Sequence, residues 1–244
     1  MKYRELYELG VRSLSESGVE EAELDARFLL EHICHTDRHA LLVHGDREVD
    51  ADQDREYIEA ISLRKTRIPL QHITGVQEFM GLEFLVSPDV LIPRQDTEIL
   101  VESALKHLHD GMKIMDMCSG SGCILLSLLK YSNDCKGLGV DLSEKALEIA
   151  RKNANRLNLD ASWVSSDLFA QIPEMPKHEK IDLLVSNPPY IRTADINELM
   201  PEVKLHEPMI ALDGKEDGLY FYRKILEDCF PFLNSGAWIL FEIG

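Results

Sequence analysis

The stretch IMDMCSGSG, residues 114–122, carries the clearest signal of fold class in this chain of 244 residues. An apolar β-type run contains Asp116, two glycines follow at Gly120 and Gly122, and an apolar helical pattern begins directly after them. A strand, a glycine-rich turn and a helix in this order are typical of the ligand-binding edge of an α/β domain. Glycine lets the backbone approach a ligand closely, and the helix N-terminus presents free N–H groups. A tight turn without a ligand is the alternative interpretation.

The spacing within this turn narrows the type of ligand. The dinucleotide pattern G-x-G-x-x-G would place a third glycine where Leu125 stands, so that pattern fails. The pattern D-x-x-x-G-x-G remains, and it suits S-adenosylmethionine, which has an amino-acid head and a ribose but no pyrophosphate. Asp141 ends the next predicted strand, where a carboxylate can accept hydrogen bonds from a ribose diol. Helix capping is the alternative role for Asp141, although Ser143 can also fill it.

A candidate adenine site follows the third predicted strand, 162–165. Asp167 is expected to meet the adenine amino group, and Leu168 and Phe169 are expected to pack on the adenine face. An aspartate in a loop is common, so this expectation is less specific than that for Asp141.

Strands and helices alternate from residue 97 onward. The predicted strands are 113–117, 137–141, 162–165, 181–186 and 237–243, and the predicted helices are 97–108, one ending at 129, 143–157 and 220–232. This alternation indicates a parallel sheet with helices on both faces, as in Rossmann-like α/β folds.

The first 70 residues have a helical apolar pattern and are predicted to form a small bundle, with Asp37 and Asp50 as N-caps of its third and fourth helices. The next stretch is rich in Gly and Pro and is predicted to be a hairpin connector with β segments at 83–86 and 90–92. The predicted domains are therefore 1–70, 71–93 and 94–244.

The composition restricts the possible partners. Asp and Glu outnumber Lys and Arg by 43 to 26, for a net charge of −17, which argues against a general nucleic-acid-binding surface.

The five cysteines have no CxxC spacing and are interpreted as reduced thiols of a cytoplasmic protein, and the histidines near the N-terminus show no metal-site pattern. No apolar run approaches the ~18 residues of a membrane span, and the N-terminus lacks an apolar signal core.

The tetrapeptide NPPY, residues 187–190, follows the predicted strand 181–186 and should reach the same edge of the sheet as the glycine turn. The Asn187 side-chain oxygen and the Pro188 carbonyl can accept both N–H bonds of a planar NH₂ group, and Tyr190 can stack on that group. Such positioning suits methylation of an amide or a nucleobase amine, and no strong base is needed because the proton becomes acidic once the methyl has moved. A proline-rich turn without a ligand is the alternative.

Over nearly its whole length the chain resembles the peptide chain release factor glutamine methyltransferases. The resemblance rests on five stretches. They are PLQHITG (69–75) with EFMGL (78–82), VLIPRQDTE (90–98) where the family has VLIPRPDTE, DMCSGSG (116–122), NPPY (187–190), and the tract from PEV through EP and AL to DGL (201–219). NPPY alone is shared with nucleobase-amine methyltransferases, whereas the 90–98 and 201–219 stretches are specific to this family.

The resemblance implies a methyl transfer from S-adenosylmethionine to the glutamine side chain of the Gly-Gly-Gln motif in class I release factors, with the helical domain recognising the release factor. It implies that Asn187, Pro188, Pro189 and Tyr190 hold the glutamine. The cofactor residues it implies, together with those argued above, are Asp116, Cys118, Ser119, Gly120, Ser121, Gly122, Asp141, Asp167, Leu168 and Asn187. Leu168 replaces a frequent Trp, which weakens stacking on adenine. Phe79, Arg94 and Glu98 are expected to shape the pocket. For Arg94 and Glu98 the alternative is a salt bridge that ties the connector to the catalytic domain.

The resemblance also implies a class I methyltransferase sheet, which usually has seven strands, the last two forming an antiparallel hairpin. Only five strands are predicted here, so the sheet is expected to lack its last two, to expose an apolar edge and to show weak stability or self-association. The alternative activities are methylation of an exocyclic amine in DNA or RNA, which the acidic charge disfavours, a non-catalytic translation-factor binding module, and an NAD oxidoreductase, which Leu125 disfavours. No metal, membrane or direct nucleic-acid partner is expected.

Overall fold

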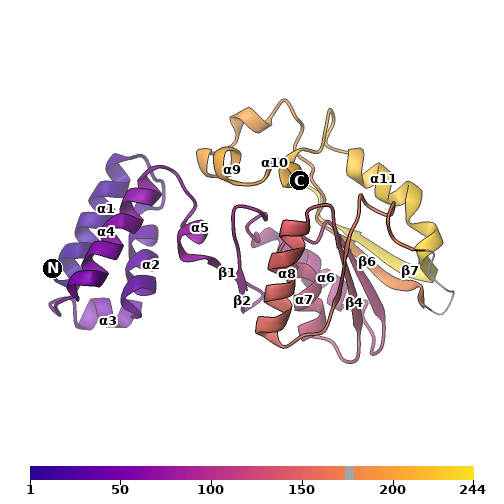
Figure 1. The fold of residues 1–244 in the computed structure, drawn as a ribbon, viewed down its shortest axis with the longest axis horizontal. Coiled ribbons are helices and arrows are strands. Elements are labelled where there is room, and N and C mark those ends of the chain that lie inside the picture. The colour runs from indigo at the N-terminus through magenta and orange to yellow at the C-terminus, as the bar shows by residue number, and fades with distance from the viewer. Residues whose placement is uncertain (174–178) are drawn as a thin grey trace. The chain divides into compact units, whose positions relative to one another are not determined.

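A computed structural model describes residues 1–173 and 179–244 of the chain (Figure 1). These residues form two compact units. The first comprises Met1–Gly75 and Pro201–His206, and the second comprises Val76–Met200 and Glu207–Gly244. In the described part of the chain, no helix has both the length and the apolar character needed to cross a membrane.

The first unit is helical. Three of its helices, α1, α2 and α4, bury Leu6, Leu29 and Tyr57 in a common core, and Tyr57 Oη donates to the Ala26 carbonyl at 3.1 Å. The two predicted N-caps are confirmed, since Asp37 accepts from the Ala40 N–H and Asp50 from the Asp52 N–H. The helices are α1 (Tyr3–Glu16), α2 (Ala22–Cys34), α3 (Arg38–Val43), α4 (Ala51–Lys65), α5 (Leu70–Thr74) and α9 (Pro201–His206).

Helix α9 makes this unit discontinuous in sequence. Glu202, on α9, accepts from Arg64 at 2.8 Å through one oxygen and from Arg67 at 2.7 Å through the other. Arg64 also donates to Asp25 at 2.7 Å, and the side chains of Arg64 and Asp25 are only 8% and 9% exposed. Because buried charges need partners, this network fixes α9 on the bundle.

The second unit contains the parallel sheet predicted from the alternating pattern. Its strand order is β5-β4-β3-β6-β7, and all four strand pairs are parallel. The five strands are β3 (Lys113–Met117), β4 (Lys136–Asp141), β5 (Ser162–Ser165), β6 (Ile181–Ser186) and β7 (Leu233–Phe241), so each strand predicted from residue 97 onward is found. Its helices are α6 (Asp96–Leu105), α7 (Cys123–Lys130), α8 (Glu144–Leu157), α10 (Met209–Leu212) and α11 (Tyr220–Asp228).

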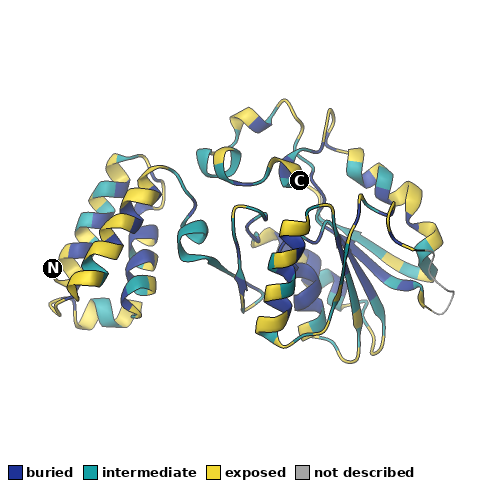
Figure 2. Cartoon of the chain, in the orientation of Figure 1, coloured by how far each residue is buried: buried dark blue, intermediate teal, exposed yellow. Residues whose placement is uncertain are grey.

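Side chains alternate between the two faces of this sheet, as the period of a strand requires. On one face Ile114 and Leu183 pack against α6, α7 and α8, and on the other Met115 and Leu184 pack against Ile225 of α11. Figure 2 shows that α7 and the central strands are largely buried. The carboxyl ends of the central strands are therefore held rigidly from both sides.

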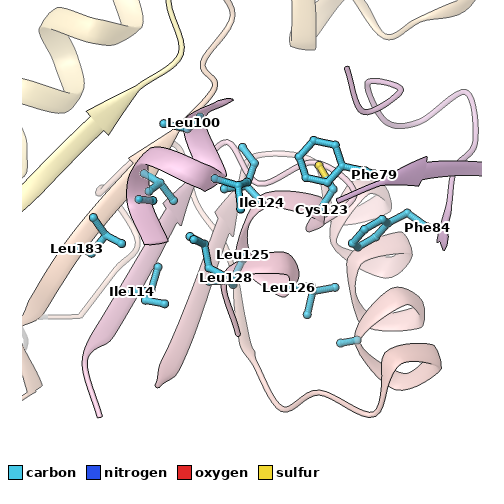
Figure 3. Packing of buried hydrophobic residues seen from close by; sticks show 14 residues of the cluster. Phe79, Phe84, Leu100, Ile114, Cys123, Ile124, Leu125, Leu126, Leu128 and Leu183 are labelled. Carbon is cyan, nitrogen blue, oxygen red and sulfur yellow. The ribbon is translucent and has the colours of Figure 1, made fainter. Parts of the chain in front are cut away.

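The connector between the bundle and the sheet differs from the prediction. The hairpin consists of β1 (Val76–Phe79) and β2 (Leu82–Leu85), and the β segment expected at 90–92 is not a strand. Pro88 and Pro93 flank that segment and cannot donate to a sheet ladder, and the Val90 N–H closes a turn onto the Ser87 carbonyl instead. Phe79 and Phe84 of the hairpin pack edge to face, 6.1 Å apart, against the same core as Ile124 (Figure 3).

Candidate active site

A cavity lies at the carboxyl ends of strands β3, β4 and β6 and encloses about 720 Å³ of empty space, counting its open mouth. The predicted site residues on its wall are Cys118, Gly120, Asp141, Asp167, Leu168, Asn187 and Pro189. The structure thus brings the glycine turn and part of the NPPY turn to one cavity.

The two glycines of the turn lie in different surroundings. Gly120 has φ +52°, and a Cβ built on it would meet nothing within 4 Å, because the residue borders the open cavity. Gly122 has φ +78°, and its Cβ would lie 2.7 Å from the ring of Trp163. A side chain at Gly122 is therefore excluded by the packing of the turn, whereas the bare backbone of Gly120 is open to a ligand.

Asp141 is positioned by the same turn. Its Oδ2 accepts from the Gly120 N–H and its Oδ1 from the Ser143 N–H, both at 2.8 Å. Burial raises the pKa of Asp141, and these backbone donors counteract the increase. Ser143 Oγ accepts from the Ala146 N–H and caps α8, so the capping role falls to Ser143. The carboxylate of Asp141 lines the cavity and retains acceptor capacity for a hydroxyl donor.

Four residues predicted as cofactor ligands do not reach the cavity wall, namely Asp116, Ser119, Ser121 and Gly122. Asp116 is completely buried under the turn, and its Oδ2 accepts from the Leu125 N–H in the first turn of α7 at 3.2 Å. Burial raises the pKa of Asp116 to about 8. Asp116 of β3 thus anchors the first turn of α7 to the sheet.

The predicted adenine site is only partly assembled. Asp167 and Leu168 line the cavity, and Leu168 has a left-handed backbone with φ +50°, held by a hydrogen bond from Ser166 Oγ to its carbonyl. Phe169 is instead buried and stacks on Phe232 with ring centroids 4.9 Å apart. The aromatic ring expected on the adenine face therefore belongs to the core of the unit.

The NPPY turn separates two hollows of the second unit. Asn187 and Pro189 line the first cavity, while Tyr190 lines a neighbouring hollow together with Glu242. Burial raises the pKa of Tyr190, and the nearby charge of Glu242 adds to the increase. Pro188 is buried and lines neither hollow through its side chain.

Glycines hold Tyr190 in place. A Cβ on Gly214 would lie 2.7 Å from the Tyr190 backbone, and one on Gly218 would lie 2.3 Å from its carbonyl oxygen. The backbone of Gly244 packs on the Tyr190 ring in the same way, since a Cβ added to Gly244 would lie 2.4 Å from a ring carbon. Two glycines of the 201–219 tract, Gly214 and Gly218, thus pack directly against the NPPY turn.

The three expected pocket residues all contact protein groups. Phe79 is 1% exposed in the core, Arg94 donates to both oxygens of Glu207 at 2.7 and 2.8 Å, and Glu98 accepts from the Met80 N–H at 2.6 Å. None of the three lines either hollow. Arg94 and Glu98 thus stabilise the second unit internally.

Three polar residues near the site had not been identified from the sequence. Thr97 and Glu242 lie beside Asn187, and Asn153 of α8 bonds the Ser121 carbonyl of the glycine turn. The position of Glu242 directly after β7 was an available signal, because Asn187 directly follows β6 in the same way.

The sheet is parallel and doubly wound, and the glycine turn, Asp141 at the end of β4 and the first part of the NPPY turn meet at one cavity. These features define a class I S-adenosylmethionine-dependent methyltransferase. Comparison with known families agrees, since residues 5–75 match the PrmC N-terminal domain and residues 94–206 match the methyltransferase small domain. The chain belongs to the release factor glutamine methyltransferase family.

Two curated relatives illustrate this membership. The release factor glutamine methyltransferase of Geobacter sulfurreducens is 41% identical over 231 residues, covering 95% of this chain and 80% of the relative. That of Clostridium acetobutylicum is 42% identical over 224 residues, covering 90% and 78%. Among solved structures, a methyltransferase from Pyrococcus furiosus aligns with a TM-score of 0.47 at 18% identity, covering 78% of each chain.

Proposed function

We propose that this protein methylates the side-chain amide nitrogen of the glutamine in the Gly-Gly-Gln motif of class I peptide chain release factors, and so modulates translation termination. The observation that carries the proposal is the placement of Asn187 on the wall of the cavity that the glycine turn also lines. Membership of the release factor glutamine methyltransferase family supports the choice of substrate.

The cavity residues fit S-adenosylmethionine. Asp141 would accept from the ribose hydroxyls, the open backbone at Cys118 and Gly120 would face the amino-acid head, and Asp167 and Leu168 would meet the adenine. Bound S-adenosylmethionine supplies an electrophilic methyl group carried on a sulfonium.

The NPPY turn would hold the acceptor. Asn187 Oδ1 and the Pro188 carbonyl would accept the two N–H bonds of the glutamine amide, which orients the nitrogen lone pair toward the methyl. Tyr190 would contact the planar amide from the neighbouring hollow. Because the amide nitrogen becomes acidic once it is methylated, its proton can leave to water without a strong base.

The acidic surface favours a protein substrate. A net charge of −17 repels a nucleic-acid backbone but attracts a basic patch on a release factor. Docking through such a patch should weaken as the salt concentration rises.

Mass spectrometry of release factor peptides after incubation with enzyme and donor tests the proposal. We expect a gain of one methyl on the glutamine of the Gly-Gly-Gln peptide. The variant Asn187→Ala should lose turnover by at least about 100-fold while its affinity for the donor stays within a few-fold. Transfer of labelled methyl to DNA or RNA, with the release factor unlabelled, would overturn the proposal.

A further inference from the structure

The carboxylate of Glu242 lies beside the NPPY turn because of the sheet register. Ser186, the last residue of β6, pairs with Phe241, the last residue of β7, and the Glu242 N–H donates to the Ser186 carbonyl at 3.0 Å. Asn187 and Glu242 are thus the next residues along two neighbouring parallel strands. The hydroxyl of Tyr222 donates to the Glu242 carbonyl at 2.7 Å and anchors that end of the strand.

Helix α6 supplies a third group at this position. Thr97 is 2% exposed, and its Oγ1 accepts a hydrogen bond from Asn187 Nδ2 at 3.3 Å. Both Thr97 and Asn187 lie close enough to the Glu242 carboxylate to lower its pKa, which burial raises. The Thr97 hydroxyl can donate its single hydrogen to Glu242 and still accept from Asn187. The three side chains therefore form a connected network.

This network distinguishes the two ends of the Asn187 amide. An ionised carboxylate is an acceptor only, so it attracts the NH₂ end of Asn187 and repels the oxygen end. With Nδ2 directed to Thr97 and Glu242, Oδ1 is the end left to accept from a ligand in the cavity. A flipped amide would present donors to the donors of an incoming NH₂ group. We propose that Glu242 and Thr97 are positioning residues that hold Asn187 with Oδ1 facing the cavity.

This inference rests on the proposed function for its catalytic consequence, but the orientation of Asn187 is a property of the free protein. Glu242 Oε2 is buried and has no hydrogen-bond partner in the described ranges 1–173 and 179–244. A buried carboxylate oxygen without a donor costs stability, and this oxygen has its acceptor sites open to the NH₂ end of Asn187 or the hydroxyl of Thr97.

Substitution of the carboxylate by an amide of the same size provides the first test. In Glu242→Gln the side chain can donate to Asn187 Oδ1, so the flipped amide is no longer excluded. We expect kcat to fall by about 10- to 100-fold, the size of effect expected when one charge-assisted hydrogen bond is lost. The Kd for S-adenosylmethionine should change by less than about threefold. The matched control Glu227→Gln, at an exposed position on α11, should match the wild type.

Thr97 provides a conservative pair. Thr97→Val keeps the shape but removes the hydroxyl and should also lower kcat by about 10-fold or more, whereas Thr97→Ser keeps the hydroxyl and should lose less than about threefold. A purely structural role for Thr97 predicts the reverse order, because valine fills the buried site better than serine does.

The pH dependence provides a readout that packing alone would not change. Burial raises the pKa of Glu242, and the interactions with Thr97 and Asn187 partly offset the increase. Protonation turns one carboxylate oxygen into a donor that can bond Asn187 Oδ1, so the flipped amide is no longer excluded. The value of kcat should therefore fall on the acidic side at a pH above the ordinary range of Glu, and this limb should disappear in Glu242→Gln. The other titratable and charged groups facing Glu242 are Arg94, Asp96, Cys123, Tyr190 and Tyr222.

A measurement without turnover separates this inference from the proposed function. In the free protein, the two side-chain NH₂ proton resonances of Asn187, assigned by their loss in Asn187→Ala, should shift with the titration of Glu242. If the wild type transfers no methyl to a release factor but these resonances titrate, the substrate proposal fails and the positioning stands. Unchanged kcat in Glu242→Gln, or resonances that do not titrate in the wild type, would overturn the positioning role.

Discussion

The side chain of Asn153 holds the glycine turn and the hairpin together, and its removal should destabilise the second unit strongly. Asn153 is completely buried on α8. Its Oδ1 accepts from the Leu85 N–H at 2.7 Å, and its Nδ2 donates to the Leu85 carbonyl at 3.0 Å and to the Ser121 carbonyl at 2.9 Å. Asn153→Ala leaves three backbone groups without these partners, two of them at the end of β2 and one in the glycine turn.

The size of the effect follows from the cost of these groups. A hydrogen bond contributes about 1 kcal/mol net, and a buried group left unsatisfied costs about 1–3 kcal/mol. Leu85 is only half-buried, so water can replace part of what is lost there. We therefore expect the free energy of unfolding to fall by about 3–4 kcal/mol, which at a slope near 2 kcal/mol/M lowers the urea midpoint by about 1.5–2 M.

Urea unfolding followed by tryptophan fluorescence measures this change selectively, because both tryptophans, Trp163 and Trp238, belong to the second unit. The control is Asn155→Ala, which makes the same substitution at an exposed position of the same helix and should change stability by less than about 0.5 kcal/mol. Equal midpoints for the two variants would refute the reasoning. Asn153→Asp should be unstable at neutral pH and recover as the pH falls, because protonation removes a buried charge that faces two carbonyl oxygens.

Three further outcomes are expected. Arg94→Ala leaves the Glu207 carboxylate, whose side chain is 1% exposed, without its cation. Because Arg94 itself is 37% exposed, water screens part of the interaction, and the free energy of unfolding from urea titrations should fall by only about 2–3 kcal/mol. The double variant Arg94→Ala/Glu207→Gln should recover part of this loss. Gly120→Ala and Gly111→Ala both place a Cβ in open space at positive φ, so each should lower the free energy of unfolding by about 1–2 kcal/mol. Calorimetric titration with S-adenosylmethionine should show weakened binding only for Gly120→Ala, because only Gly120 borders the cavity. Burial raises the pKa of Asp116 to about 8, so the folded state binds the proton of this carboxyl more tightly than the unfolded state does. The free energy of unfolding should therefore fall as the pH rises from about 4 to 8. A flat profile for the wild type, or the same slope in Asp116→Asn, would contradict this.

The elements that could be predicted from the sequence are those that local rules specify. The strand before Gly120, the caps at Asp37 and Asp50, and the placement of Asp141 and Asn187 on one cavity all follow from spacing and from the topology of a parallel sheet. The short hairpin strands were harder, because Gly and Pro residues indicated a turn-rich segment without fixing which pieces pair.

The remaining features depend on contacts between residues far apart in sequence. Phe79 resembles a pocket residue in its motif, yet the structure packs it against Phe84 and the core under α7. The charges of Arg94 and Glu207 stand 113 residues apart and join the 90–98 and 201–219 stretches. Such pairings are set by the tertiary fold, so a single sequence does not reveal them.

The discontinuous helical unit has a consequence for biosynthesis. Arg64 and its partner Glu202 are separated by 138 positions, so the bundle leaves the ribosome with a buried cation that still lacks one of its two carboxylates. At about 5–20 residues per second, the missing helix follows roughly 7–28 s later. The first unit therefore completes its charge network only after most of the second unit has been synthesised, and a fragment ending at Gly75 would remain in the unfinished state of a nascent chain.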